Sequence, residues 1–78
     1  MPFSKIQQKK LNALGQKVKD LRKERNLTLQ QLAHSIGKDI QSIHRLEQGG
    51  VNPSYLYLLQ ICEGLEIEIA DLLKGLEE

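Results

Sequence analysis

The stretch LQQLAHSIGKDIQSIHRLEQ occupies residues 29–48 and contains two short apolar patterns with a glycine between them. Ala33 stands four residues before Gly37, and a small residue is needed at such a position when a second helix packs over it. Gly37 suits a turn position with positive φ, a conformation that strains residues with a Cβ atom. The other apolar positions of this pattern include Leu32, Ile36, Ile43 and Leu46. This pattern predicts two helices that cross at a tight turn.

Both expected helices have a recognisable first turn. Thr28 precedes the first helix and Gln31 follows three residues later, which is the capping box that satisfies free amides at a helix start. Asp39 can cap the second helix in the same way. We therefore expect helices over residues 29–36 and 40–48 in a helix-turn-helix, whose second helix can enter the major groove of DNA.

The second expected helix has one polar face. Its apolar residues Ile43 and Leu46 point one way. Polar side chains recur at i, i+3, i+4 and i+7 on another face: Gln41, His44, Arg45 and Gln48. On an isolated helix, such a stripe is most often an ordinary solvated surface. Its place in a helix-turn-helix pattern favours a face that reads DNA.

The chain resembles the phage repressor and Cro type of helix-turn-helix, also called the XRE family. The resemblance runs from about residue 14 to residue 73 and rests on separated pieces: LGQKVKDLRKERNLT before the motif, LAHSIG and SIHRLEQG within it, and NPSYLYLLQICEGLEIEIADLL after it. It implies an all-α fold, a compact five-helix bundle of the lambda repressor type. Helices are expected at about residues 11–25, 29–36, 40–48, 55–63 and 69–74.

Length and composition agree with one small domain. The 78 residues are 40% hydrophobic and only 4% aromatic, which is enough for one modest aliphatic core. We expect a basic arm or helix extension over residues 1–10, the helix-turn-helix domain over residues 11–76 and an acidic tail at residues 77–78. The expected core residues are Leu11, Leu14, Val18, Leu21, Tyr55, Leu58, Ile61, Cys62, Leu65, Ile67, Ile69, Leu72 and Leu73.

The sequence carries no pattern typical of secretion, membrane insertion or catalysis. It lacks a signal segment and any run approaching the roughly 20 apolar residues that span a bilayer, and its single cysteine cannot form an internal disulfide. We therefore expect a cytoplasmic protein without membrane contact. No phosphate-binding, dinucleotide or nucleophile motif occurs, and His34, His44 and Cys62 lack the spacing of a zinc site. An enzyme, a metal and a cofactor are not expected.

The net charge of +1 hides an uneven distribution. Residues 1–25 hold eight Lys or Arg against Asp20 and Glu24, a balance of +6, whereas the remainder holds three against eight, a balance of −5. A basic N-terminal part beside the motif can attract the phosphates of DNA, since phosphate neutralisation supplies much of nonspecific affinity. A solvated charged helix face is the alternative meaning for each single lysine.

The resemblance implies that the N-terminal part of the second motif helix reads bases, because that part reaches the floor of the major groove. The expected readout residues are Ile40, Gln41, His44 and Arg45. Gln41 can bond to adenine and Arg45 to guanine, each through two hydrogen bonds. Ile40 can pack on a thymine methyl group, and His44 can meet a base or a phosphate.

Phosphate contacts are expected around both ends of the motif, from side chains and from the amide end of its first helix. The residues are Thr28, Leu29, Gln30, Lys38, Gln48 and Gly49. The resemblance also implies a partly buried ion pair between Arg22 and Glu47, which would hold the second motif helix against the first helix of the chain. Two independent surface charges are the alternative.

Several residues depart from the family pattern. Lys38 stands where an apolar residue is usual, so its methylene stem must cover the core while its ammonium group reaches solvent. Asp39 stands where Ser or Thr commonly touches phosphate, and a carboxylate there would be repelled. The loop at residues 50–52 is uncharged. Glu68 replaces the usual Ser or Thr before the last helix. These departures predict weak DNA binding by one monomer.

Weak monomer binding makes a homodimer the expected form. Leu56 and Tyr57 fall at positions that the family usually gives to polar residues, and Leu76 lies beyond the expected core. Together they are expected to form an apolar patch that joins two copies through the C-terminal half. Scattered exposed apolar residues, which need no partner, are the alternative. A two-fold dimer would read half-sites about 34 Å apart.

The sequence thus predicts a transcription regulator without enzymatic activity that binds double-stranded operator DNA as a homodimer. The alternative is a protein-interaction module, such as an antitoxin or accessory subunit, with weak or residual DNA binding. Asp39 and the uncharged loop favour this alternative, and the polar face of the second motif helix opposes it.

Overall fold

A computed structural model of the chain describes residues 3–76. These residues form five α-helices: α1 (Lys5–Glu24), α2 (Leu29–Ser35), α3 (Ile40–Glu47), α4 (Tyr55–Leu65) and α5 (Ile69–Leu73). The all-α, five-helix fold expected from the sequence is confirmed. The acidic tail expected at residues 77–78 lies outside the described residues.

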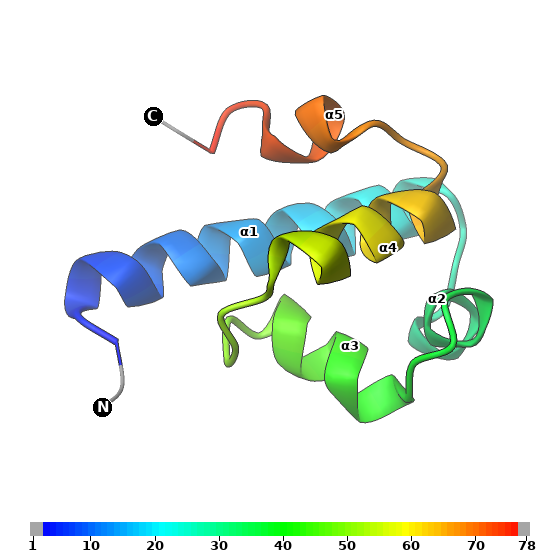
Figure 1. The fold of residues 1–78 in the computed structure, drawn as a ribbon, viewed down its shortest axis with the longest axis horizontal. Helices are drawn as coiled ribbons and strands as arrows, with labels where there is room; N and C mark the ends of the chain where they lie inside the picture. The colour runs from blue at the N-terminus through cyan, green and yellow to red at the C-terminus, as the bar shows by residue number, and fades with distance from the viewer. Residues whose placement is uncertain (1–2, 77–78) are drawn as a thin grey trace.

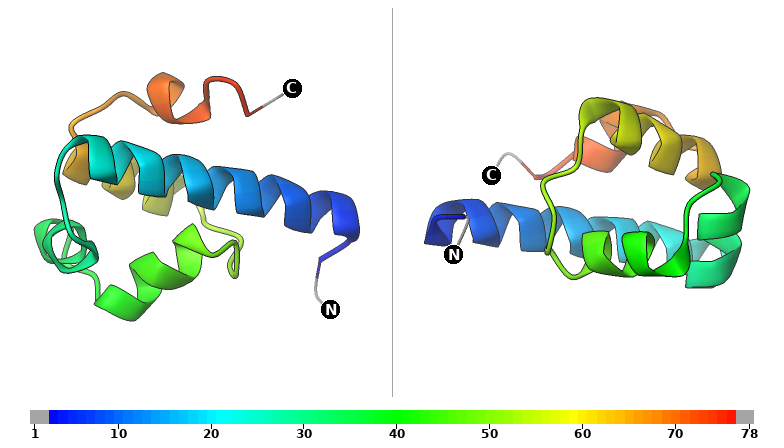
Figure 2. Two further views of the ribbon diagram at one scale, coloured as in Figure 1. Left: turned by 180° about the vertical axis from the view of Figure 1, so that it is seen from behind. Right: turned by 60° about the horizontal axis from the view of Figure 1, so that its bottom comes forward.

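The long helix α1 lies in the middle of the bundle (Figure 1). Helices α2 and α3 lie on one side of α1, α5 lies on the other side, and α4 crosses its front. In this view α2 is seen nearly end-on whereas α3 runs across the picture, so the two motif helices cross steeply. The two further views show the same order, with the first turns of α1 projecting beyond the other helices (Figure 2).

The core is aliphatic, and all five helices contribute residues to it. Its fully buried residues include Val18 from α1, Ile43 from α3 and Ile61 from α4. The other buried apolar residues are Leu32, Ala33, Leu46, Cys62, Leu65 and Leu72. Burial raises the pKa of the Cys62 thiol most, and the charges of Asp71 and Glu68 raise it further, so the thiol stays protonated within the core.

Two residues expected in the core are instead exposed. Tyr55 retains 64% and Leu73 retains 42% of their accessible surface. Tyr55 is the first residue of α4, and the segment YLYLL is apolar on every side. Apolar periodicity therefore cannot indicate which side of this helix faces the core, and the packing of α4 decides it.

The first helix begins six residues earlier than expected, at Lys5 rather than at residue 11. Ser4 caps it: the Ser4 hydroxyl accepts a hydrogen bond from the Gln7 amide, and the Gln7 side chain accepts one from the Ser4 amide. This is the same capping box that marks α2, so the signal was present in the sequence. Residues 5–10 therefore extend α1 as a helix.

Candidate nucleic-acid interface

Helices α2 and α3 are joined by a tight turn that the local sequence dictates. The Thr28 hydroxyl accepts from the Gln31 amide at 3.0 Å, and the Gln31 side chain accepts from the Thr28 amide at 2.8 Å. Gly37 has a φ of +69°, and the following Lys38 amide donates to the Ala33 carbonyl at 2.9 Å. The capping box of α2 and the positive φ of Gly37 are thus as predicted, and the turn satisfies the free carbonyls at the end of α2.

Asp39 sets the start of α3. Its carboxylate accepts a hydrogen bond from the Ser42 amide at 2.7 Å. Hydrogen bonds from Ser42 lower the pKa of Asp39 most, and the nearby positive charges of Arg45 and Lys38 lower it further. The negative charge of Asp39 therefore persists at neutral pH on an exposed carboxylate that caps the N-terminus of α3.

The inner side of α3 is fixed to α1 by Arg22 and Glu47. Arg22 Nε donates to Glu47 Oε2 at 2.7 Å, and Arg22 Nη2 donates to Glu47 Oε1 at 3.1 Å. The two residues retain only 7% and 6% of their accessible surface. The third guanidinium nitrogen, Nη1, donates to the Leu27 carbonyl at 2.7 Å. The arrangement expected from the resemblance is therefore present, with both carboxylate oxygens occupied.

Two further contacts hold α3 along α1, and neither was predicted from the sequence. A Cβ atom on Gly15 would lie 2.5 Å from the carbonyl oxygens of Leu46 and Glu47, so only glycine permits this approach. The side-chain amide of Gln8, Nε2, donates to the Gly49 carbonyl at 2.7 Å, just beyond the end of α3. Gly15 within a helical pattern was a visible signal of close packing, but nothing in the sequence links Gln8 to Gly49, which is 41 residues away.

The outer side of α3 presents the residues expected to read bases. Gln41, His44 and Arg45 are exposed, and Ile40 retains 41% of its accessible surface. Among residues 3–76, the structure records no hydrogen bond or ion pair to the side chains of Gln41, His44 and Arg45. The structure thus brings these four residues together on one open face, which runs from the first turn of α3 (Ile40 and Gln41) to its last turn (His44 and Arg45).

The residues expected to contact phosphate differ in how exposed they are to solvent. Thr28, Gln30 and Gln48 are exposed around α2 and α3, whereas the Leu29 side chain is half-buried and packs on the core. Gly49 does not fit the expectation, because it is buried, its amide donates to the Leu46 carbonyl and its carbonyl accepts from Gln8. A backbone group already paired inside the bundle has no free donor for phosphate.

Lys38, in the turn, is exposed, and its ammonium nitrogen lies 5.1 Å from the ring centroid of Tyr57 in α4. The sequence suggested that its stem would cover the core while its charge reached solvent. In the structure the charge lies over an aromatic face, a contact that the sequence did not indicate.

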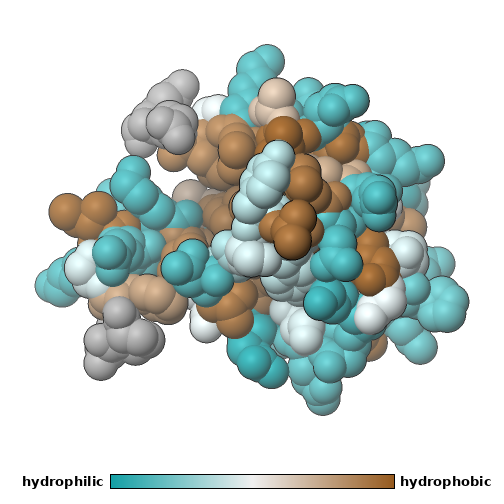
Figure 3. All heavy atoms as spheres, in the orientation of Figure 1, coloured by the Kyte–Doolittle hydropathy of each residue, from teal (hydrophilic) through white to brown (hydrophobic). Residues whose placement is uncertain are grey.

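The three residues expected to form one apolar patch lie in different places. Leu56 retains 71% of its accessible surface, and apolar side chains gather over α4 on this face of the molecule (Figure 3). Tyr57 is half-buried beside Lys38. Leu76 instead lines grooves beside α1, with Ala13 and Lys17 in one groove and Ile6 in another. The chain turns back toward α1 after α5, which separates Leu76 from the surface of α4 (Figure 1).

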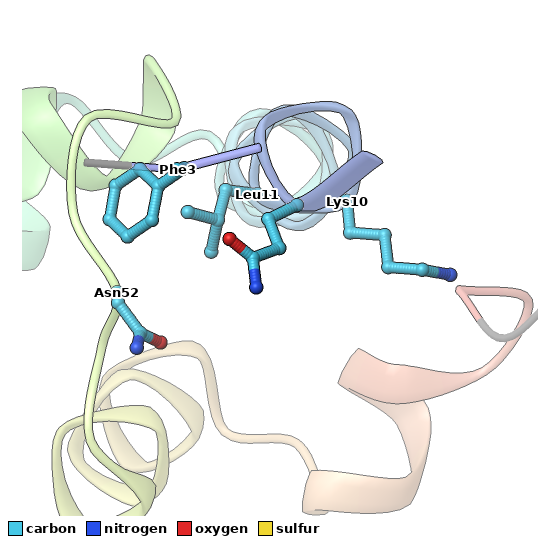
Figure 4. A pocket seen from close by; sticks show the side chains of 5 residues that line it. Phe3, Lys10, Leu11 and Asn52 are labelled. Atoms are coloured by element: carbon cyan, nitrogen blue, oxygen red, sulfur yellow. The ribbon is translucent and has the colours of Figure 1, made fainter. Parts of the chain in front are cut away.

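A hollow of about 480 Å³ lies between the start of α1 and the α3–α4 loop (Figure 4). Phe3, Leu11 and Asn52 surround it, while the Lys10 side chain extends away from the loop.

Within the described range, residues 3–76, no group of three His, Cys, Asp or Glu side chains is placed to hold a metal ion. No helix in that range is both long enough and apolar enough to cross a membrane.

Comparison with known proteins gives the family. Residues 18–72 match the helix-turn-helix family HTH_3. Among solved structures, the restriction-modification controller protein C.AhdI from Aeromonas hydrophila is 31% identical, with a TM-score of 0.77 over 80% of this chain and 94% of that one. The clp gene regulator ClgR from C. glutamicum is 26% identical, with a TM-score of 0.82 over 87% and 88%.

A third structure, an HTH_3 family transcriptional regulator from Vibrio cholerae, shares the fold with a TM-score of 0.82 at 24% identity. It aligns with 91% of this chain, which corresponds to 40% of the longer protein. No curated protein sequence matches the chain. The chain belongs to the helix-turn-helix family HTH_3, a family of DNA-binding transcription regulators.

Proposed function

We propose that this protein is a sequence-specific transcription regulator that acts in the cytoplasm as a homodimer on a palindromic operator, without catalysis. In this proposal α3 enters the major groove. Gln41 bonds to adenine, Arg45 bonds to guanine and Ile40 packs on a thymine methyl group. His44 meets a base or a phosphate. Binding then blocks or recruits polymerase at the regulated promoter.

The observation that carries the proposal is the difference between the two sides of α3. Its inner side is fixed by Glu47 and Leu46, which are buried against α1. Its outer side presents Gln41, His44 and Arg45, which have no side-chain partner among residues 3–76. A rigid helix with unpaired hydrogen-bonding side chains is suited to reading base edges, because those groups lose only water on binding.

Phosphate contacts would position α3 in the groove. We assign them to the Leu29 amide, the side chains of Thr28, Gln30 and Gln48, and the Lys38 ammonium group. The basic residues of α1 would add sequence-independent attraction. One similar protein is named a clp gene regulator and another a restriction-modification controller protein, and these names support a regulatory function.

Selection of DNA fragments with the purified protein tests the proposal. Sequencing the bound fragments should give a palindromic consensus with half-sites about one helical turn apart. Titration of a consensus fragment at several salt concentrations should give an affinity that falls steeply with salt. Fragments without a consensus, or an affinity independent of salt, would contradict a regulator anchored by phosphates.

A protein-interaction module is the second candidate. The solvated charge of Asp39 beside the expected DNA surface and the exposed side chain of Leu56 favour it. In that case the protein should bind all DNA fragments with similar weak affinity, and Arg45→Ala should leave that affinity nearly unchanged. The same selection experiment therefore separates the two candidates.

A further inference from the structure

Lys38 and Tyr57 form a contact between the helix-turn-helix turn and α4. Lys38 lies between α2 and α3, and its Nζ atom is 5.1 Å from the centroid of the Tyr57 ring. A cation at this distance from an aromatic face is attracted by the negative charge density of the ring. The two residues also line one groove, in which Ser54 and Gln60 take part. The turn between α2 and α3 thus contacts a side chain of α4.

The Tyr57 ring is held in place by the first turn of α4 and by packing against the core. The Tyr57 amide donates to the Ser54 hydroxyl at 3.0 Å, which anchors the first turn of α4. The side chain packs against the core, and its hydroxyl oxygen is buried without a hydrogen-bond partner among residues 3–76. Leaving a buried hydroxyl unpaired is unfavourable, so the position of this ring must be determined by its packing.

Tyr57 also lies within electrostatic reach of the start of α3. Burial raises the pKa of Tyr57 most, the negative charge of Asp39 raises it further, and the positive charge of Arg45 lowers it. The charges of the residue that caps α3 and of a residue that we expect to read a base therefore both act on Tyr57.

We propose that Tyr57 is a positioning residue that holds the Lys38 ammonium group at the DNA-facing turn without touching DNA itself. A free lysine side chain samples many rotamers and loses this freedom when it binds a phosphate. A ring that restricts the side chain beforehand reduces that loss. The inference rests on the phosphate contact proposed above for Lys38, and it assigns Tyr57 to the inside of one protomer rather than to contact between protomers.

A double-mutant cycle tests the inference. DNA affinity is measured for the wild type, Tyr57→Leu, Lys38→Ala and the double variant, at matched salt and with equal molecular mass checked by light scattering. Tyr57→Leu should weaken binding about two- to fivefold, the range that an exposed cation–π contact allows. In the Lys38→Ala background it should have no effect. Equal weakening in both backgrounds would overturn the inference.

Tyr57→Phe is the matched control, because it keeps the aromatic face and removes the unpaired hydroxyl. It should retain the affinity of the wild type, whereas loss of affinity in this variant would contradict a role for the ring. Thermal melts establish that each variant is folded. If Tyr57→Leu does not fold, Tyr57→Met replaces it, since the flexible methionine side chain fills irregular space.

A measurement without DNA separates this inference from the proposed function. The aromatic ring should shift the NMR signals of the Lys38 methylene protons upfield in the wild type and in Tyr57→Phe, but not in Tyr57→Leu. Absence of this shift in the wild type would overturn the contact, even if the protein selects DNA normally. If the shift is present but the wild type shows no DNA preference and no salt dependence, the proposed function fails and the role of Tyr57 in DNA binding fails with it.

Discussion

Arg22 binds Glu47 through two hydrogen bonds and thereby connects α1 to α3, the second helix of the helix-turn-helix motif. The same guanidinium group donates to the Leu27 carbonyl just before α2. One side chain therefore fixes both helices of the motif relative to α1. Because the Glu47 side chain retains only 2% of its accessible surface, the pair is closed to water on the carboxylate side.

Glu47→Ala should lower the melting temperature strongly. Removing one partner leaves the Arg22 charge buried and unpaired, which typically destabilises a protein by about 3–5 kcal/mol. In a domain of this size, each kcal/mol shifts the melting temperature by about 4–8 °C. Glu63→Ala is the control, because Glu63 is exposed on α4. This variant should have the melting temperature of the wild type. An unchanged melt for Glu47→Ala would reduce the ion pair to a minor contact.

Gly15→Ala should destabilise the protein, although alanine normally favours a helix over glycine by about 1 kcal/mol. The new Cβ atom would collide with the Leu46 and Glu47 carbonyl oxygens, which belong to the backbone and cannot turn away. Overpacking of this kind costs about 1–3 kcal/mol, enough to reverse the gain in helix propensity. Urea unfolding measures the difference, and Gln16→Ala at the next, exposed position is the control. Increased stability of Gly15→Ala would show that α3 does not lie this close to α1.

The local parts of the fold were predictable from the sequence. The capping box at Thr28, the cap at Asp39 and the positive φ of Gly37 are each determined within four residues of chain. The start of α1 is equally local, at Ser4. The apolar stripe used to place that helix begins only at Leu11, so the sequence left residues 1–10 as either an arm or a helix extension.

The contacts that orient the candidate site were not predictable in the same way. The pairs Gln8 with Gly49 and Lys38 with Tyr57 join residues far apart in the sequence, and neither pair has a charge pattern that indicates it. Arg22 and Glu47 were paired only through a family resemblance. The side of α4 that is buried was also undetermined, because its first five residues are all apolar or aromatic.

Asp39→Asn should tighten DNA binding severalfold for all sequences. The change removes a negative charge beside the expected phosphate path, and asparagine remains a good helix cap. The affinity should also become more dependent on salt, since one repulsive charge no longer offsets the phosphate contacts. Fluorescence anisotropy with a specific and a random fragment measures both effects. Weaker binding to both fragments would place Asp39 away from the phosphates.

Acid melts provide a second readout of the same variant. The pKa of Asp39 is lower in the folded protein than in the unfolded chain, because the charged form accepts hydrogen bonds from Ser42. The stabilisation that the charged Asp39 cap provides is therefore fully present above the pKa of the unfolded chain, about 3.9. It is lost as the pH falls through the lower pKa of Asp39 in the folded protein. Any stability advantage of the wild type over Asp39→Asn should therefore decrease as the pH falls from about 3.9 through the lower pKa of the folded protein.

Arg45→Ala and Lys38→Ala should weaken DNA binding in different ways. Without Arg45, the preferred operator should lose about 1–3 kcal/mol of binding free energy, and the preference at one base pair of each half-site should relax. Without Lys38, affinity should fall alike for all sequences, because a phosphate contact carries no sequence information. Repeating the fragment selection with each variant measures these losses. An equal loss of sequence preference in both variants would show that the assigned roles are wrong.

Leu56→Glu should convert the proposed homodimer into a folded monomer. Leu56 is the most exposed large apolar residue described in the chain, so its replacement removes no core contact and should leave the melting of a monomer unchanged. In a two-fold interface each new carboxylate would lie near its own copy, and both would lose water, which strongly disfavours association. Light scattering at micromolar concentration should show half the wild-type mass. Gln41→Glu adds the same charge to the exposed face of α3 and should keep the dimer mass while losing DNA preference. A wild-type mass for Leu56→Glu would place the interface elsewhere or exclude it.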